Sequence, residues 1–261
     1  IDEILLTEAR NELSALIGMD EIKKDINEII DIVRFKRSHG ENLLHKYFFH
    51  TMLIGNPGTG KTTVARILAK LFKALSILER GHLVETDRQG LIAGFVGQTA
   101  IKTTEKIDEA VGGVLFIDEA YALGGASFND FGNEAIQVLL KRMEDDRGKF
   151  FVFAAGYPDN MDTFIKSNPG LSSRFDKTMK FYDYNHDELM QISKKMLADN
   201  NFRISEKAAQ HLTNYIEFIY QYRDKYFGNA RTIRLIVDEI IKKHNLRMVK
   251  EAIVVIGKKK V

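Results

Sequence analysis

Hydrophobic residues recur at helical spacing in three stretches of the first 180 residues, Ile22–Val33, Val64–Leu75 and Ile136–Met143. The first stretch begins after Asp20, which we expect to be the helix N-cap, and its pattern stops at Gly40. Five short apolar runs have strand character instead and lie at residues 47–54, 82–86, 113–118, 150–155 and 177–182. Strands that alternate with helices predict a parallel sheet with helices on both of its faces.

The strand pattern ends at Tyr182, and helical signals follow it. Residues 185–188, NHDE, predict a capping box at the start of a helix, and Ser205 is the expected cap of a second helix. A third helix is predicted around Ile233–Ile240, where apolar residues again recur at helical spacing. We therefore expect an α/β domain over residues 1–182 and a small helical domain over residues 183–261.

Composition excludes several classes of protein. The formal net charge is only +2, and the single basic run, Lys258–Lys260, is too short to be a nucleic-acid-binding stripe. The absence of cysteine excludes a disulfide framework and thiolate sites, and it fits the reducing cytoplasm. No apolar run approaches the ~18 residues of a membrane span, and no signal peptide opens the chain. The chain begins at Ile1 without methionine, as a piece of a longer protein would.

Residues 55–62, GNPGTGKT, match the phosphate-binding pattern G-x-x-x-x-G-K-[ST] and lie between an apolar strand and a helix. We expect backbone N–H groups of this loop to surround the phosphates of ATP, because Gly55, Gly58 and Gly60 allow the chain to curl. Lys61 should neutralise charge on the β- and γ-phosphates, and Thr62 should offer its hydroxyl to Mg²⁺. The predicted nucleotide-binding residues of the loop are Asn56, Pro57, Gly58, Thr59, Gly60, Lys61, Thr62 and Thr63.

Residues 114–120, VLFIDEA, end an apolar strand with two adjacent carboxylates. Asp118 is placed to hold Mg²⁺ through water, and Glu119 to orient or deprotonate the water that attacks the γ-phosphate. Taken alone, the pair could equally be an acidic helix N-terminus that interacts with the helix dipole. The lysine of the phosphate loop lies 57 positions upstream (118 minus 61), which favours the catalytic interpretation and predicts hydrolysis of ATP.

These motifs together resemble the AAA+ ATPases. The set LIGM, GNPGTGKTT, GFVGQT, GGVLFIDEAY, NPGLSSRF and GNARTIR is similar to the group that contains red-type rubisco activase and stage V sporulation protein K. The resemblance spans about residues 13–247. It implies an α/β fold with a five-stranded parallel sheet in the order 5-1-4-3-2, flanked by helices and followed by an all-α lid domain. It also implies a homo-oligomeric ring, a hexamer, that acts on a protein substrate.

The resemblance assigns roles to further residues. Arg174, in NPGLSSRF, falls where the family has an arginine finger that reaches the γ-phosphate of the neighbouring subunit. Arg231, in GNAR, matches the second sensor, which contacts phosphate within its own subunit. Ile17 and Gly18 correspond to the adenine pocket. Considered without the resemblance, the two arginines would be interpreted as ordinary surface residues.

The stretch GFVGQT has two interpretations. By itself it predicts a glycine-rich turn whose Phe95 enters the core. In the resemblance it lies between the second strand and the next helix, where AAA+ rings have a pore loop of an aromatic residue, an apolar residue and glycine. Phe95, Val96 and Gly97 fit that triplet, and an aromatic tip can grip an extended polypeptide of any sequence. We therefore expect Phe95 to be exposed at a substrate-gripping loop.

Other functions share the predicted ATP site. A nucleic-acid motor is one, although the sequence has neither a basic stripe nor arginines interleaved with aromatic residues. A small-molecule kinase is another, but it would need a second substrate pocket. A scaffold that binds ATP with little turnover is a third, because the polar first sensor after the fourth strand is replaced by Gly156 and Tyr157. We expect a protein-remodelling ATPase, with no membrane partner and a substrate that the sequence does not identify.

Overall fold

The computed structural model describes residues 1–39, 49–95, 97–124, 131–175, 177–224 and 227–258, with side chains up to residue 250. The chain forms two compact units. One comprises Ile1–Asn56 and Gly60–Tyr182, and the other comprises Pro57–Thr59 and Asp183–Val261. The middle of the predicted phosphate loop therefore belongs to the second, helical unit.

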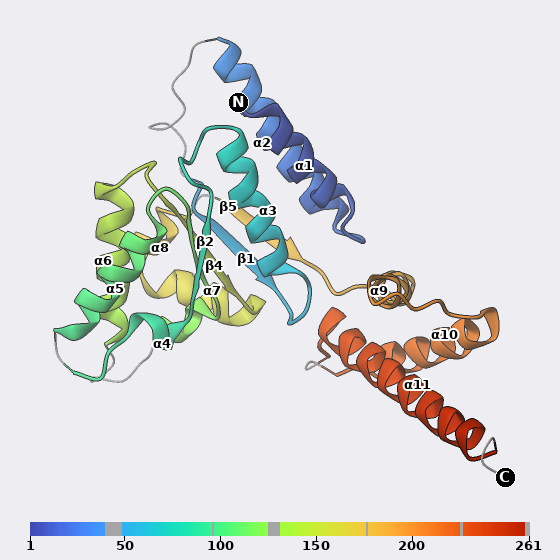
Figure 1. The fold of residues 1–261 in the computed structure, drawn as a ribbon. Coiled ribbons are helices and arrows are strands. Elements are labelled where there is room, and N and C mark those ends of the chain that lie inside the picture. The colour runs from blue at the N-terminus through green and yellow to red at the C-terminus, as the bar shows by residue number, and fades with distance from the viewer. Residues whose placement is uncertain (40–48, 96, 125–130, 176, 225–226, 259–261) are drawn as a thin grey trace. The chain divides into compact units, whose positions relative to one another are not determined.

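The first unit is built on a parallel sheet (Figure 1). Its strands are β1 Thr51–Gly55, β2 Leu83–Thr86, β3 Val114–Ile117, β4 Phe151–Gly156 and β5 Lys177–Phe181. Their order is β2-β3-β4-β1-β5, and every neighbouring pair is parallel. Read from the other edge, this is the predicted order 5-1-4-3-2, so the expected fold is confirmed.

The first strand is shorter than predicted. It begins at Thr51 rather than at residue 47, and residues 47 and 48 lie outside the described part of the chain. Phe49 lies before the strand, and its apolar side chain packs in the core instead of marking a strand position. Its ring packs against Phe72 and Phe151, with centroid distances of 5.1 and 5.3 Å.

Helices cover both faces of this sheet. In chain order the first unit contains α1 Glu3–Ser14, α2 Asp20–Ser38, α3 Lys61–Ala74, α4 Arg88–Leu91, α5 Gln98–Ala110, η1 Ala120–Leu123, α6 Gly132–Asp145, α7 Pro158–Ser167 and α8 Pro169–Ser172.

The prediction of Asp20 as an N-cap was wrong, because Asp20 is the first helical residue and Met19 is the cap. The chain enters α2 through Gly18 and Met19, both left-handed with φ of 64° and 60°, so the backbone makes the turn without a side-chain cap.

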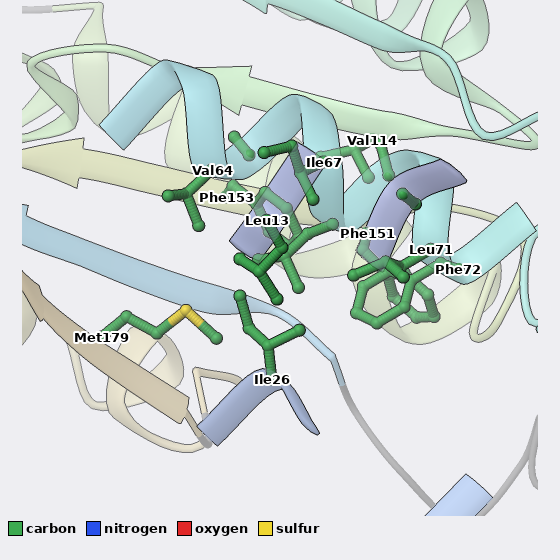
Figure 2. Close-up of a cluster of buried hydrophobic side chains, with 14 of the residues drawn as sticks. Leu13, Ile26, Val64, Ile67, Leu71, Phe72, Val114, Phe151, Phe153 and Met179 are labelled. Carbon is green, nitrogen blue, oxygen red and sulfur yellow. The ribbon is translucent and has the colours of Figure 1, made fainter. Parts of the chain in front are cut away.

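The hydrophobic core lies in two layers, one on each face of the sheet. In β3, Val114 and Phe116 belong to the cluster with α1, α2 and α3, whereas Leu115 and Ile117 belong to the cluster with α5, α6 and α7. All four are at most 2% exposed. Figure 2 shows the first cluster, where side chains of these helices gather against the strands. A strand buried on both faces needs a continuous apolar run, which is what the sequence has here.

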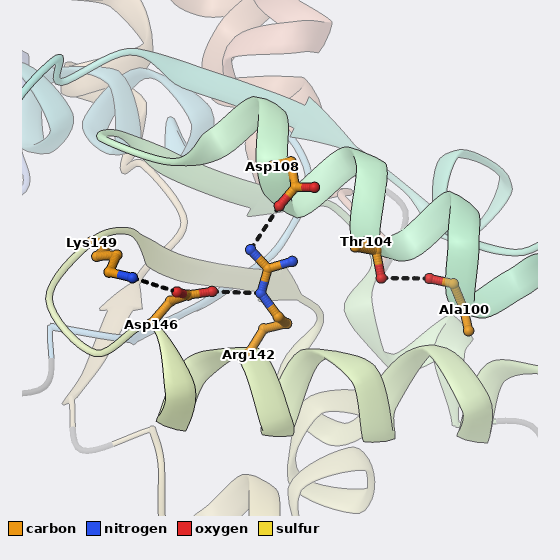
Figure 3. Close-up of polar contacts among 6 residues, drawn as sticks. All are labelled: Ala100, Thr104, Asp108, Arg142, Asp146 and Lys149. Atoms are coloured by element: carbon orange, nitrogen blue, oxygen red, sulfur yellow. Dashed lines mark hydrogen bonds and ion pairs between the residues drawn. The ribbon is translucent and has the colours of Figure 1, made fainter.

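A polar network joins α5 to α6 (Figure 3). Arg142 of α6 donates from Nη2 to Asp108 of α5 at 2.7 Å and from Nε to Asp146 at 2.5 Å. Lys149 donates to the other carboxylate oxygen of Asp146 at 2.9 Å. The hydrogen bond from Lys149, together with that from Arg142, holds the pKa of Asp146 below its ordinary value. The network fixes the end of α5 against α6.

The second unit contains α9 His186–Asp199, α10 Glu206–Gln221 and α11 Ala230–Lys258. The predicted capping box is confirmed, because the Asn185 side chain accepts from the Glu188 N–H at 2.9 Å and the Glu188 carboxylate accepts from the Asn185 N–H at 2.8 Å. Ser205 caps α10 as predicted. None of the helices in the described ranges is both long and apolar enough to span a membrane.

Candidate functional site

The predicted phosphate loop connects the carboxyl end of β1 to the amino end of α3. Gly58 and Gly60 have φ values of 70° and 92°, in the left-handed region that glycine adopts without strain. Gly60 is also the N-cap of α3, so the first N–H groups of a 14-residue helix, which the helix itself cannot bond, lie at the end of the loop. Such a helix start favours an anion such as phosphate.

Gly55 and Lys61 stabilise the base of the loop. A Cβ atom on Gly55 would lie 2.4 Å from the carbonyl oxygen of Phe181 in β5. Glycine is therefore required here by the close approach of two strands, and not by the curl of the loop as we expected from the sequence. The Lys61 ammonium donates to the carbonyls of Gly55 and Asn56, both at 2.8 Å. A positive charge is thus held at the start of the loop.

The acidic pair follows β3 at the same edge of the sheet, since carboxyl ends of parallel strands share an edge. Asp118 and Glu119 are both exposed, although β3 itself is buried. The backbone of Glu119 is left-handed, with φ 49° and ψ 43°, a conformation that costs a non-glycine residue about 1–3 kcal/mol. The Asp118 carboxylate accepts from the Glu119 N–H at 3.0 Å, and the Ala122 N–H donates to the Glu119 carbonyl at 2.8 Å. Strain of this kind is typical of functional sites.

Two tyrosines lie beside the acidic pair, and sequence reasoning identified a role for neither. Tyr121 follows Glu119 by two residues, and its ring lies 5.9 Å from that of Tyr157, the residue directly after β4. Burial raises the pKa of Tyr121 to about 12, with contributions from the Glu119 carboxylate and from Tyr157. The hydroxyl of Tyr121 therefore stays protonated near Glu119. The position after β4 where a first sensor was expected is occupied by Gly156 and Tyr157, and the ring of Tyr121 lies beside that of Tyr157.

These residues fit ATP and Mg²⁺. The start of α3 supplies N–H donors for phosphates, and Lys61 supplies a positive charge. Mg²⁺ is commonly held by one or two oxygen side chains together with substrate phosphates. Thr62, half-buried in the first turn of α3, and Asp118 offer a hydroxyl and a carboxylate, whereas Thr63 is exposed. In the described part of the chain, no group of three or more acidic or histidine side chains could hold a metal alone.

Within the second unit, the middle of the loop meets the start of α11. Asn229 Nδ2 donates to the carbonyl of Pro57, and the Ala230 N–H donates to the carbonyl of Gly58, each at 3.2 Å. A Cβ atom on Gly58 would lie 2.0 Å from a backbone oxygen just before α11, so only glycine permits this approach. Arg231, the predicted second sensor, is exposed in the first turn of the same helix.

Asn229 is a residue that sequence reasoning missed. It is fully buried and left-handed, with φ 48°. Besides its bond to Pro57, its Nδ2 donates to Asp183 Oδ1 at 2.8 Å and its Oδ1 accepts from the Tyr184 N–H at 3.1 Å. One amide therefore joins the middle of the phosphate loop to the start of the helical segment. Its place in GNAR, two residues before the predicted sensor arginine, is the signal that could have identified it.

Arg174 lies at the amino edge of the sheet, three residues before β5. Its Nη2 is 3.5 Å from Glu144 of α6, and its Nε is buried with no hydrogen-bond partner among the described residues. His50, which directly precedes β1, is its neighbour and is 2% exposed. Burial, with the positive charge of Arg174, lowers the pKa of His50 to about 3, and His50 Nδ1 accepts from the Val152 N–H at 2.9 Å.

Ile17 and Gly18, the predicted adenine-pocket residues, lie in the turn between α1 and α2. Both are half-buried, and Gly18 is left-handed. The Lys23 ammonium donates to the Leu16 carbonyl at 2.6 Å and closes this turn. Their contact with adenine stays a prediction.

Phe95 is exposed, with 72% of its surface accessible, so the core interpretation of the glycine-rich turn is excluded. The loop follows the short helix α4 rather than β2 directly, which the sequence did not indicate. A Cβ atom on Gly94 or Gly97 would meet no atom within 4 Å, and Gly97 has φ 79°. Val96, the middle residue of the predicted triplet, lies outside the described residues.

The phosphate loop after β1, the acidic pair after β3 and the strand order β2-β3-β4-β1-β5 define an ATPase of the AAA class. Residues 51–182 match the family described as "ATPase family associated with various cellular activities (AAA)", and residues 185–259 match the AAA lid domain. The chain belongs to the AAA ATPase family.

Curated relatives resemble the chain over most of its length. Stage V sporulation protein K of Bacillus subtilis is 40% identical over 247 residues, which cover 94% of this chain and 77% of the relative. Protein CbbX of Cereibacter sphaeroides is 41% identical over 226 residues, which cover 85% and 72% of the two chains. The chain is thus an AAA+ ATPase related to stage V sporulation protein K and to protein CbbX.

Solved structures add evidence for the fold alone. Two variants of RuvB from Thermotoga maritima superpose with TM-scores of 0.60 and 0.59 at 22% identity. Each alignment covers 91% of this chain, and 66% and 67% of the two RuvB chains.

Proposed function

We propose that this chain is the subunit of a homo-oligomeric ring, a hexamer, that uses Mg²⁺-dependent ATP hydrolysis to thread or remodel a protein substrate in the cytoplasm. Membership of the AAA family implies ATP hydrolysis. The relationship to stage V sporulation protein K and CbbX makes substrate remodelling the favoured use of that energy. The lack of cysteine supports a reducing compartment.

The proposed chemistry divides roles among residues of the carboxyl edge. Lys61, held at the base of the loop, would move its ammonium to the β- and γ-phosphates. Thr62 and Asp118 would hold Mg²⁺, which neutralises charge on the phosphates. Glu119 would accept a proton from the attacking water, and its left-handed backbone is held in place by the hydrogen bond from its N–H to the Asp118 carboxylate. Arg231 would contact phosphate as the second sensor.

The position of Arg174 supports the ring. It lies beyond the amino end of β5, whereas the phosphate loop leaves the carboxyl end of β1 beside it. From Thr51 to Gly55, β1 alone spans roughly 13 Å, which exceeds the length of an arginine side chain. Arg174 would therefore serve the nucleotide of a neighbouring subunit, as an arginine finger does.

The observation that carries the threading proposal is the exposure of Phe95 on a glycine-flanked loop. An exposed phenylalanine at a glycine-flanked loop offers an apolar, rigid contact surface, and an extended polypeptide would be its partner. The test is Phe95→Ala in the full chain, with casein as an unfolded polypeptide probe. We expect stability to change by less than about 0.5 kcal/mol, since the side chain is exposed. Basal ATPase activity should persist, while stimulation by casein should disappear.

The matched control is Phe35→Ala, which removes another exposed phenylalanine, 63% accessible and located in α2. It should keep stimulation by casein. A loss of ~3–5 kcal/mol in Phe95→Ala would mean that this side chain is buried in the working protein. Unchanged stimulation in Phe95→Ala would contradict threading through this loop.

The substrate itself can be captured with Glu119→Gln. If the carboxylate acts only on water, this variant should bind ATP without turning it over and so retain its substrate. Mass spectrometry of proteins that copurify with Glu119→Gln, but not with a Glu119→Gln, Phe95→Ala double variant, would identify candidates. Recovery of the same proteins with both variants would argue against capture by the loop.

A further inference from the structure

A guanidinium connects the turn after the acidic pair to the helix before the Phe95 loop. Arg88 is the first residue of α4, and its Nη1 donates to the carbonyl of Ala122 in η1. Asp87 caps α4 by accepting from the Gly90 N–H at 2.9 Å, which fixes Arg88 at the start of the helix. Two segments separated by 34 residues are thereby joined through one charge-assisted hydrogen bond.

The η1 end of this connection begins at Glu119. The N–H of Ala122 donates to the Glu119 carbonyl at 2.8 Å, so the residue whose carbonyl binds Arg88 belongs to the turn that begins at the left-handed Glu119. Leu91 of α4 and Leu123 of η1 are at most 1% exposed and belong to one hydrophobic cluster. Because close-packed side chains transmit displacement, a shift of η1 would be felt by α4.

The other end of α4 leads directly into the Phe95 loop. Thr103 Oγ1 donates to the Leu91 carbonyl at 3.0 Å, and the Lys102 ammonium donates to the Ile92 carbonyl at 3.1 Å. The Ala93 N–H donates to Thr99 Oγ1 at 3.1 Å. Side chains of α5 therefore hold the base of the loop, whereas a Cβ atom on Gly94 or Gly97 would meet no atom within 4 Å.

α5 is itself fastened to α6 at both of its ends. Glu134 of α6 accepts from the Ala100 N–H at 3.3 Å, and Arg142 of α6 binds Asp108 at 2.7 Å near the other end (Figure 3). This leaves the four-residue helix α4 as the short segment that touches both the turn after the acidic pair and the base of the loop.

We infer that Arg88 is a positioning residue that couples the state of Glu119 and η1 to the position of Phe95. This rests on the proposed function, because it assumes that Glu119 responds to nucleotide and that Phe95 grips substrate. A contiguous set of contacts does not by itself demonstrate energetic coupling, so the effect of one site on the other must be measured. The proposed role of Arg88 is exerted through its hydrogen bond to the Ala122 carbonyl.

The test uses tryptophan fluorescence. The chain contains no tryptophan, so Phe95→Trp places a single reporter at the tip of the loop. Emission is compared in the full chain saturated with ADP and with a non-hydrolysable ATP analogue. We expect the two nucleotides to give different emission when Arg88 is intact. Adding Arg88→Gln should shrink that difference roughly fivefold or more, while nucleotide affinity measured by calorimetry stays within about twofold.

Two further variants separate coupling from loss of folding. Arg88→Lys keeps a charged donor and should keep a reduced emission difference, even if thermal melting shows that Arg88→Gln does not fold. Arg66→Gln is the matched control, since Arg66 pairs with Glu85 on β2 in the same unit, and it should keep the full difference. A full difference in folded Arg88→Gln, or in Arg88→Lys should the former not fold, would overturn the inference. So would the absence of any difference with Arg88 intact.

The casein and fluorescence measurements together distinguish failure of the proposed function from failure of this inference. If Phe95→Ala kept its stimulation by casein while Arg88→Gln abolished the emission difference, the threading proposal would be wrong and the coupling would stand. If Phe95→Ala lost stimulation while Arg88→Gln kept the full emission difference, threading would be supported and the role of Arg88 rejected.

Discussion

At the carboxyl edge of the sheet, Asp118 and Glu119 are exposed and Glu119 is held in a strained backbone conformation. At the amino edge, His50 is buried among phenylalanine rings, beside Arg174 with its buried Nε. The carboxyl edge thus presents exposed carboxylates on a strained backbone, whereas the amino edge contains a buried imidazole beside a guanidinium group. The comparison teaches that, on the proposed function, the sheet separates the residues that would bind a nucleotide from the arginine that would reach a neighbouring subunit.

Arg174→Ala should have the largest effect. An arginine finger contributes about 10³-fold or more to hydrolysis, so we expect a loss of that order in ATPase rate with little change in nucleotide affinity. Arg147→Ala is the matched control, because Arg147 also pairs with Glu144, and it should keep most of the activity. Steady-state ATPase assays and calorimetry measure both quantities.

Mixing experiments decide whether Arg174 acts across subunits. Rings assembled from Arg174→Ala and Glu119→Gln subunits should regain part of the activity, since some neighbours then form complete sites. If mixed rings assemble and no ratio restores activity, the amino edge does not serve a neighbouring nucleotide, and the contrast between the two edges loses its functional meaning.

Two variants of the carboxyl edge, Lys61→Ala and Glu119→Gln, should differ in whether they lose ATP binding or turnover. Glu119→Gln should reduce turnover by roughly 10²-fold or more, as loss of a general base does, and should keep ATP binding. Lys61→Ala should weaken ATP binding itself, because it removes the positive charge held at the loop. Binding of a fluorescent ATP analogue and single-turnover hydrolysis measure the two effects. Equal loss of binding in both variants would contradict this division of roles.

His50→Asn tests the burial that characterises the amino edge. Below about pH 6.5 the unfolded chain binds a proton at His50, whereas the folded chain, with its pKa lowered to about 3, does not. The free energy of unfolding therefore decreases as pH falls through about 6.5 toward 3, and it decreases by about 1.4 kcal/mol between pH 7.5 and 5.5. Asparagine keeps an acceptor for Val152, so His50→Asn should show that much less pH dependence in urea unfolding. An unchanged slope would mean that His50 is not buried as a neutral ring.

Glu144→Gln should have the smallest effect. Its pair with Arg174 is long, at 3.5 Å, and Glu144 is half exposed, so stability should change by less than about 1 kcal/mol. ATPase activity should remain near that of the parent. A loss as large as that of Arg174→Ala would show that Glu144 belongs to the site that Arg174 completes.

Several features of the carboxyl edge were predictable because they depend on short segments. The phosphate loop and the acidic pair were predicted from their motifs, whereas the strand order was implied by the resemblance to AAA+ ATPases and is confirmed. The residues missed were those whose partners are distant in sequence. Asn229 bonds Pro57, 172 residues away, and Arg88 bonds Ala122, 34 residues away, so no local pattern marks either contact. Gly55 was predicted for the wrong reason, because its constraint comes from β5.

The sequence by itself determined the alternation of strands and helices, the caps at Asn185 and Ser205, and the position of the phosphate loop between β1 and α3. These follow from side-chain periodicity and from hydrogen bonds within a few residues. The exposure of Phe95, the burial of His50 and the edge occupied by Arg174 were decided only by the tertiary structure. An apolar or charged side chain has the same local signal whether it faces solvent or core, and only contacts between distant segments determine which of the two it meets.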